Sequence, residues 1–479
     1  MSESWLYVES DRENYEYDIH SLVKAFYPEK QVKVASREKL EQAEAEPFLR
    51  VHIGADETSI ECTDIDHYVI YRMPQEGKNA FKRFLYQVLS ELTGKTLPWG
   101  NLTGIRPTKI AMELLEQGKT EAEIIDFMQE EHFVSEQKAR LSLDIAKRER
   151  AILKELHYEN GYSLYIGIPF CPTTCLYCSF TSYPVCVWEK RMDEYLDCVF
   201  REIDYVAEAF RDRVLDTIYI GGGTPTSLSA ERLDRLLTKL EQTFDIASLK
   251  EYTVEAGRAD SITREKLEVI KKHHVSRISV NPQTMKDETL RLIGRQHTVA
   301  QVVDAFHMAR ETGFDNINMD LILGLPGETA QDVAATVEMV KKLDPDNLTV
   351  HSLAIKRASR LHQWIEENGI MSIRNTDETM AIAAAGARDM GMKPYYLYRQ
   401  KNMSGNFENT GYAKEGKNGI YNILIMEEKQ TIVALGAGSI TKRVFPDGRI
   451  ERCDNVKDVK LYIEQINEMI ERKRRLFAD

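Results

Sequence analysis

Between residues 163 and 353 the chain alternates short β-branched or aromatic runs with amphipathic stretches of helical spacing. The six expected strands are 163–168, 217–220, 252–255, 277–280, 317–323 and 348–353. The helical stretches between them are 188–210, 230–243, 264–273, 300–312 and 330–343. Six βα repeats at this rhythm imply a parallel sheet, either an open barrel or a doubly wound sheet. In both folds the loops that follow the carboxyl ends of the strands carry the chemistry.

Two further regions flank these repeats, which we assign to a domain of residues 159–370. Residues 1–158 predict an accessory domain of mixed α/β structure followed by helices, in which 48–53 alternates as an edge strand would. Residues 371–479 predict an α+β extension. We expect this extension to cover the substrate that the central repeats would bind. Its expected elements are a helix at 381–390, strands at 395–398, 421–426 and 431–435, and one closing helix at about 456–474.

Charge and composition exclude several classes of protein. A formal net charge of −13 over 479 residues argues against a general polyanion binder, so no nucleic-acid partner is expected. The N-terminus is acidic and lacks a positive region followed by an apolar stretch, so no signal peptide is expected. No apolar run reaches the roughly 20 residues that cross a bilayer. The seven cysteines are odd in number and three of them are clustered, which favours a reducing cytoplasm over a disulfide scaffold.

The clustered cysteines are Cys171, Cys175 and Cys178, in the spacing C-x3-C-x2-C directly after the first expected strand. Three thiolates at this spacing can converge on one iron–sulfur cluster and leave one iron open to another ligand. Zinc sites more often contain pairs of C-x2-C, and the remaining alternative is three buried structural thiols. Cys186 lies eight residues beyond Cys178 and could be a further ligand, but it is expected to be a buried thiol. The other cysteines carry no ligand spacing.

Residues after other expected strands are further candidates. Gly221, Gly222 and Gly223 follow the second strand and let the backbone approach a ligand closely, although they could also form a tight turn. Glu255 ends the third strand, where it could accept hydroxyl or ammonium donors. Asp320 interrupts an apolar strand, and burying a carboxylate there is costly unless it is paired or binds something.

The cysteine spacing resembles the signature of the radical S-adenosylmethionine (SAM) enzymes. The surrounding residues are similar to one branch of them, the oxygen-independent coproporphyrinogen III oxidase group of the HemN and HemZ type, and most like the HemZ type. The shared features are Tyr165, the run Ile168 to Cys171, Tyr177, the run Gly221 to Thr226, Gln283 with Arg295, and the run Asp320 to Pro326. The first 150 residues resemble the extra domain of the HemZ type.

The resemblance implies a partial (βα)6 barrel in which Cys171, Cys175 and Cys178 hold a [4Fe-4S] cluster and carry the radical chemistry. It implies one or two SAM molecules. The residues expected to serve the cluster-bound SAM are Tyr165, Gly222 and Glu255. The residues that match a second SAM site are Tyr177, Gly223, Thr224, Gln283, Arg295, Asp320 and Ala354.

The implied activity is oxidative decarboxylation of coproporphyrinogen III propionates to vinyl groups, giving protoporphyrinogen IX in haem biosynthesis. A flavodoxin or ferredoxin would supply electrons. Basic residues at the barrel mouth would bind the propionates, because guanidinium pairs with carboxylate bidentately. The candidates are Lys356, Arg357, Lys393, Arg399 and Lys401.

Two positions depart from the founding oxidases. Phe180 stands where those enzymes have a fourth cysteine, and Gly167 stands where they have a histidine. The haem-chaperone branch shares the phenylalanine. The alternatives are therefore a haem-binding chaperone or trafficking protein, and a radical SAM methyltransferase or haem-degrading enzyme on the same scaffold.

Overall fold

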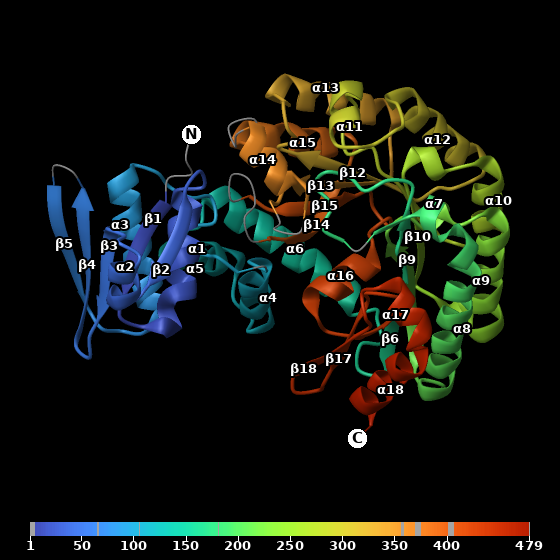
Figure 1. Cartoon of the computed structure of the whole chain (residues 1–479), viewed down its shortest axis with the longest axis horizontal. Helices are drawn as coiled ribbons and strands as arrows, with labels where there is room; N and C mark the ends of the chain where they lie inside the picture. Colours follow the sequence, from blue (N-terminus) through green and yellow to red (C-terminus); the bar gives the residue numbers. More distant parts are fainter. Residues whose placement is uncertain are drawn as a thin grey trace. The chain divides into compact units, whose positions relative to one another are not determined.

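The computed structural model describes residues 5–64, 67–104, 106–180, 182–355, 359–368, 375–400 and 407–478 (Figure 1). Lys356, Arg357 and Lys401 lie outside the described residues. The chain forms two compact units. The first contains Met1–Ala146 with Tyr398–Glu408, and the second contains Lys147–Leu397 with Asn409–Asp479.

The first unit contains a five-stranded sheet in the order β2-β1-β3-β4-β5. Its strands are β1 (Trp5–Ser10), β2 (Gln31–Ala35), β3 (Pro47–Ile53), β4 (Glu57–Asp64) and β5 (His67–Pro74). Its helices are α1 (Glu16–Phe26), α2 (Arg37–Gln42), α3 (Lys78–Thr93), α4 (Thr108–Glu116) and α5 (Glu121–His132), and α6 (Glu136–Leu153) begins in it. Segment 48–53 lies in β3, which pairs on both sides, so the predicted edge position is wrong. The alternating pattern that suggested an edge arises instead because β3 buries one face only.

The second unit is organised around six parallel strands that lie side by side in chain order. They are β6 (Gly161–Ile168), β9 (Val214–Gly222), β10 (Glu251–Gly257), β11 (Arg277–Val280), β12 (Ile317–Leu323) and β13 (Asn347–Ser352). A doubly wound sheet would reverse its order at a switch point. Because no reversal occurs among these six strands, the winding is that of a barrel, and the predicted α/β fold is confirmed.

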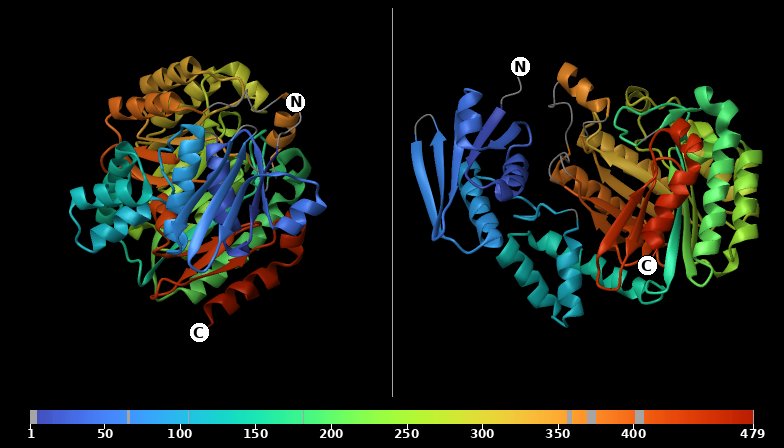
Figure 2. Two further views of the ribbon diagram at one scale, coloured as in Figure 1. Left: turned by 90° about the vertical axis from the view of Figure 1, so that its left-hand side faces the viewer. Right: turned by 60° about the horizontal axis from the view of Figure 1, so that its bottom comes forward.

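The helices of the repeats cover the outer side of this sheet (Figures 1 and 2). They are α8 (Met192–Ala209), α9 (Ala230–Thr243), α10 (Arg264–Lys272), α11 (Asp287–Leu292), α12 (Val299–Glu311) and α13 (Ala330–Leu343). The strands are almost continuously buried, as expected for parallel strands with both faces covered. Each helix instead buries one stripe, which is why the change of period between strands and helices was readable from the sequence.

The C-terminal part extends the sheet at both ends. At one end, β15 (Asn409–Ala413) pairs antiparallel with β13, and β14 (Lys393–Tyr398) lies beyond it. At the other end, β16 (Thr431–Leu435) pairs parallel with β6, followed by β17 (Ile440–Val444) and β18 (Ile450–Asp454). The remaining strands and α-helices described in the second unit are the short strands β7 (Phe170–Cys171) and β8 (Tyr183–Pro184), and the helices α7 (Val185–Trp188), α14 (Leu361–Asn368), α15 (Asp377–Asp389), α16 (Ile420–Glu427), α17 (Val459–Glu464) and α18 (Ile466–Phe477).

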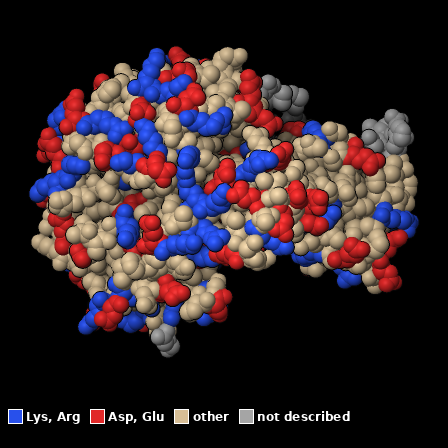
Figure 3. Space-filling model, turned by 180° about the vertical axis from the view of Figure 1, so that it is seen from behind, with Lys and Arg blue, Asp and Glu red and all other residues tan. Residues whose placement is uncertain are grey.

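Two expectations for this part are wrong. The predicted strand at 421–426 is helix α16, and the single closing helix is two helices, α17 and α18. Among the described residues, no helix is long and apolar enough to cross a bilayer. Acidic and basic side chains are interspersed over the face that Figure 3 shows.

Candidate functional site

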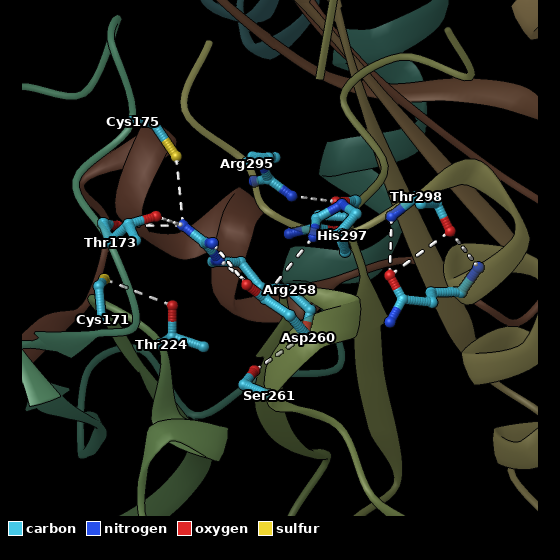
Figure 4. A network of polar contacts seen from close by, with 12 residues as sticks. Cys171, Thr173, Cys175, Thr224, Arg258, Asp260, Ser261, Arg295, His297 and Thr298 are labelled. Carbon is cyan, nitrogen blue, oxygen red and sulfur yellow. Dashed lines mark hydrogen bonds and ion pairs between the residues drawn. The ribbon is translucent and has the colours of Figure 1, made fainter. Parts of the chain in front are cut away.

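The three clustered cysteines lie in the loop between β6 and α8, at the carboxyl ends of the barrel strands. Cys175 is buried, and Cys171 and Cys178 are partly buried. The Cys171 sulfur lies 3.4 Å from the hydroxyl of Thr224, and the Cys175 sulfur accepts a hydrogen bond from Arg258 at 3.7 Å (Figure 4). The loops after the first, second and third parallel strands therefore meet at the thiols.

The glycine run after β9 brings its backbone against the cysteine loop. The amide of Gly223 donates to the carbonyl of Ile168, and the amide of Thr224 donates to that of Phe170, both at 2.8 Å. A Cβ atom on Gly223 would lie 2.7 Å from the Phe170 oxygen and 2.9 Å from the Ile168 oxygen. Glycine at this position is therefore required for the close approach of two loops.

The chemistry of the three thiols fits an iron–sulfur cluster, for which thiolates are the usual ligands. Among the described residues, no three His, Cys, Asp or Glu side chains lie close enough to share one metal ion. Each thiolate of a cluster binds a different iron, so cluster ligands lie farther apart than the ligands of one ion. Burial raises the pKa of Cys171 to about 11, and the neighbouring thiols add to this, although the Thr224 hydroxyl opposes it. A cationic metal centre would counteract this rise in the pKa, because it stabilises the thiolates.

Beside the thiols lies a group of buried polar atoms without hydrogen-bond partners among the described residues. Arg295 donates to the carbonyl of Asn281 at 2.6 Å and to the hydroxyl of Tyr177 at 3.3 Å. Its Nε atom, however, has no hydrogen-bond partner, and neither do Oδ1 of Asn281 and Oε1 of Gln283. Unsatisfied buried groups of this kind are rare in folded proteins unless they bind a ligand or water. The arrangement fits a polar cofactor such as SAM.

Glu255 extends from β10 into the barrel interior. The hydroxyl of Tyr219 on β9 donates to its carboxylate. Burial raises the pKa of Glu255 to about 7, and the charge of Asp320 adds to this, whereas Tyr219 lowers it. The rings of Tyr165, Tyr219 and Tyr421 form a stack beside it, with 4.4 Å between the centroids of Tyr219 and Tyr421.

Asp320 lies on β12 and belongs to a hydrogen-bonded chain across two strands. Asn318 donates to its carboxylate at 2.7 Å, and the hydroxyl of Thr349 on β13 donates to Asn318 at 3.0 Å. Nε2 of His351 lies 3.8 Å from the same carboxylate. Burial raises the pKa of Asp320, but the contacts with His351 and Asn318 outweigh it, so the pKa lies below its ordinary value.

The other predicted residues have different surroundings. Gly222 ends β9 with a φ of 109°, and Ala354 lies two residues beyond the end of β13. Lys393 is exposed and pairs with Glu415 at 4.0 Å. Arg399 is buried in the first unit, where it donates to the carbonyl of Leu102, so it is not a surface cation. Cys186 is exposed, which corrects its expected burial; it lies on the short helix α7.

Sequence reasoning missed four polar residues of the site. Tyr219 and Tyr421 line the barrel interior beside Glu255, and Arg258 and Asp260 lie beside the cysteine loop. Arg258 and Asp260 immediately follow β10, so their position after a strand was the signal that could have identified them.

Comparisons with known proteins agree with this geometry. Residues 165–340 match the profile of the Radical SAM superfamily. The oxygen-independent coproporphyrinogen-III oxidase-like protein HemZ of Bacillus subtilis is 40% identical over 404 residues, which are 83% of this chain and 81% of that protein. The heme chaperone HemW of the same organism is 32% identical over 64% of this chain and 76% of its own length. The structure of coproporphyrinogen III oxidase (HemN) from Escherichia coli matches with a TM-score of 0.52 and 23% identity, over 67% of this chain and 72% of that one.

Proposed function

The chain belongs to the radical SAM superfamily, in its oxygen-independent coproporphyrinogen-III oxidase-like group, and we propose that it converts coproporphyrinogen III to protoporphyrinogen IX. Membership of this family gives the chain a [4Fe-4S] cluster and SAM as cofactors. The observation that carries the proposal is the similarity to HemZ over 81% of that protein's length, because it extends beyond the cofactor-binding repeats into both flanking regions.

The residues of the site have separate roles in this proposal. Cys171, Cys175 and Cys178 hold the cluster, and the bound cofactors together supply a 5′-deoxyadenosyl radical. Glu255 accepts hydrogen bonds from SAM, since its carboxylate lies beside the glycine run that approaches the cysteine loop. The Nε–H of Arg295 has no hydrogen-bond partner among the described residues and can donate to an anionic or carbonyl oxygen.

In this proposal the tetrapyrrole lies against aromatic rings of the barrel interior. Tyr165, Tyr219 and Tyr421 stack on one another there, and Tyr421 is contributed by the C-terminal part. We propose that residues 371–479 cover the substrate, and that the predicted basic residues near the mouth, Lys356 and Arg357, bind its propionates. Loss of one hydrogen atom from a propionate β-carbon to the deoxyadenosyl radical, and of one electron to an external one-electron acceptor, then releases the carboxylate as carbon dioxide and leaves a vinyl group.

A second candidate function is haem binding for delivery to another protein. Phe180 favours it, because it replaces the fourth cysteine of the founding oxidases and its side chain is 69% exposed. The 32% identity to the heme chaperone HemW also favours this function. A carrier would bind oxidised, metal-filled haem and return coproporphyrinogen III unchanged.

One experiment separates the two functions. The reconstituted protein is incubated without oxygen with coproporphyrinogen III, SAM and dithionite, and the porphyrins are separated by chromatography. The enzyme should form vinyl products, with roughly one SAM cleaved per propionate lost. Glu255→Gln should retain the cluster but weaken SAM binding by on the order of 10- to 100-fold, because one charge-assisted hydrogen bond contributes about 1.5–3 kcal/mol.

A parallel titration with haem completes the test. If haem binds stoichiometrically with a sharp absorption change, while coproporphyrinogen III is recovered unchanged, the chaperone function replaces the oxidase. Vinyl products from the wild-type protein, absent when any cluster cysteine is replaced, would establish the oxidase.

A further inference from the structure

Arg258 is a buried cation beside the cysteine loop, and the proposed function does not require it. It follows β10 by one residue, and only 3% of its surface is exposed. Figure 4 shows its side chain extending toward Thr173 and Cys175. A buried arginine is costly unless its charge is paired and its N–H groups are hydrogen-bonded.

The two edges of the guanidinium group have different partners. Nε and Nη2 donate to the two carboxylate oxygens of Asp260, at 2.9 and 2.6 Å. Nη1 donates to the carbonyl and the hydroxyl of Thr173, at 3.0 and 2.8 Å, and to the sulfur of Cys175 at 3.7 Å. The bidentate pair with Asp260 fixes the plane of the group, so that Nη1 is directed at the cysteine loop.

A third loop supports this pair. Nδ1 of His297, which is 2% exposed, lies 3.5 Å from Oδ1 of Asp260. Three residues earlier, the carbonyl of Gly294 accepts a hydrogen bond from the Thr173 hydroxyl at 2.8 Å. Polar contacts thus connect the loops after β6 and β10 with the segment between α11 and α12, and Arg258 donates to Cys175 from within this network.

We infer that Arg258 is a positioning residue for the cluster, which holds a fixed positive charge and an N–H donor against the Cys175 ligand and thereby raises the reduction potential. Outer hydrogen bonds and nearby charges are known to tune iron–sulfur centres. The inference rests only on the cluster, so it is independent of whether the tetrapyrrole is decarboxylated or carried.

The direction of the effect follows from charge. Reduction adds one electron, supplied by dithionite in a titration, and so adds one negative charge beside Cys175. The positive charge of Arg258 stabilises the reduced state, whereas the negative charge of Asp260 destabilises it. Removing the two charges one at a time should therefore shift the potential in opposite directions.

The test is a reductive titration of the reconstituted protein followed by electron paramagnetic resonance, with iron and sulfide determined for each variant. In Arg258→Gln the ratio of reduced to oxidised cluster at a fixed potential should fall about tenfold, which is 59 mV for a one-electron couple. In Asp260→Asn the ratio should rise. Arg264→Gln is the matched control, since this exposed arginine pairs with Glu311 on the surface and its charge is screened.

Opposite shifts at full iron content would support the inference, because a purely structural role would lower iron content without separating the two variants. Shifts of the same sign, or none in either variant, would overturn it. If Arg258→Gln loses its iron, the decision rests on Asp260→Asn, in which an unchanged or lowered potential would reject the inference.

Discussion

At the scale of single residues, iron binding should depend on three of the seven cysteines. The wild-type protein should bind about four irons per chain. Replacing Cys171, Cys175 or Cys178 with alanine should abolish this binding, because each of the three thiolates is needed to hold the cluster. Cys186→Ala is the matched control, since this thiol is exposed on α7 and should leave the iron content unchanged. Iron and sulfide analysis after anaerobic reconstitution measures both. Full iron in all three variants would refute the assignment of the cluster.

A second prediction at this scale is that SAM affinity depends on pH through Glu255. Its pKa is raised to about 7, chiefly by burial, so the carboxyl group is neutral below about pH 7 and anionic above it. The anionic form is the better acceptor. Affinity should therefore rise between pH 6 and pH 8, and Glu255→Gln should remove the dependence. Tyr219, Asp320 and Arg277 influence the same carboxylate, so the Gln variant is needed to assign the effect. An equal pH dependence in both proteins, by equilibrium binding, would reject the role.

From the sequence, site residues whose type is unusual at their position were easier to predict than site residues whose type is common there. Asp320 stood out because a carboxylate in an apolar strand needs partners, and it has Asn318 and His351. For Arg258 the position after β10 was the one signal, and it is weak because an arginine after a strand is usually a solvated surface residue. Its importance comes from Asp260 and Thr173, and the contact with Thr173 joins residues 85 positions apart in the chain.

At the scale of elements, the approach of the glycine run to the cysteine loop can be tested with one methyl group. In Gly223→Ala the new Cβ would lie 2.7 Å from the oxygen of Phe170, and backbone atoms cannot move aside cheaply. Overpacking of this kind costs about 1–3 kcal/mol, so the midpoint of thermal unfolding should fall and SAM binding should weaken. Gly104→Ala is the control, because its Cβ would have no neighbour within 4 Å. Equal midpoints for the two variants would contradict the close approach.

Element bounds were predictable where the hydrophobic period was clear. β11, β12, α9 and α13 begin and end at the predicted residues, because each strand is a short and almost fully buried run and each helix buries one stripe. Helix α16 was mistaken for a strand because Tyr421–Met426 is a short, mostly apolar run. Periodicity cannot separate a buried strand from a buried helix at that length. Its N-terminus is fixed instead by Glu251 on β10, which accepts a hydrogen bond from the amide of Ile420 at 2.5 Å.

At the scale of the whole molecule, the last helix of the chain is tied to the first strand of the barrel through buried polar groups of the second unit. Glu202 on α8 accepts a hydrogen bond from the amide of Gly436 at 2.8 Å and pairs with Lys473 on α18 at 2.6 Å. On the same helix α8, Tyr195 donates to the carbonyl of Gly167 at 2.6 Å and accepts from the amide of Ala437 at 3.0 Å. The C-terminal part therefore closes against β6, the strand from which the cysteine loop extends.

This closure predicts that one lysine near the chain end contributes strongly to the stability of the second unit. Both Glu202 and Lys473 are fully buried, so Lys473→Met leaves an uncompensated charge and should cost about 3–5 kcal/mol. Arg475→Met removes an exposed cation two residues away and should cost less than about 1 kcal/mol. Urea denaturation of the reconstituted proteins, followed by circular dichroism, compares the midpoints. The double variant Glu202→Gln with Lys473→Met should recover part of the loss, because no charge is then left unpaired. If Lys473→Met is as stable as Arg475→Met, the buried pair does not hold the C-terminal helix against the barrel.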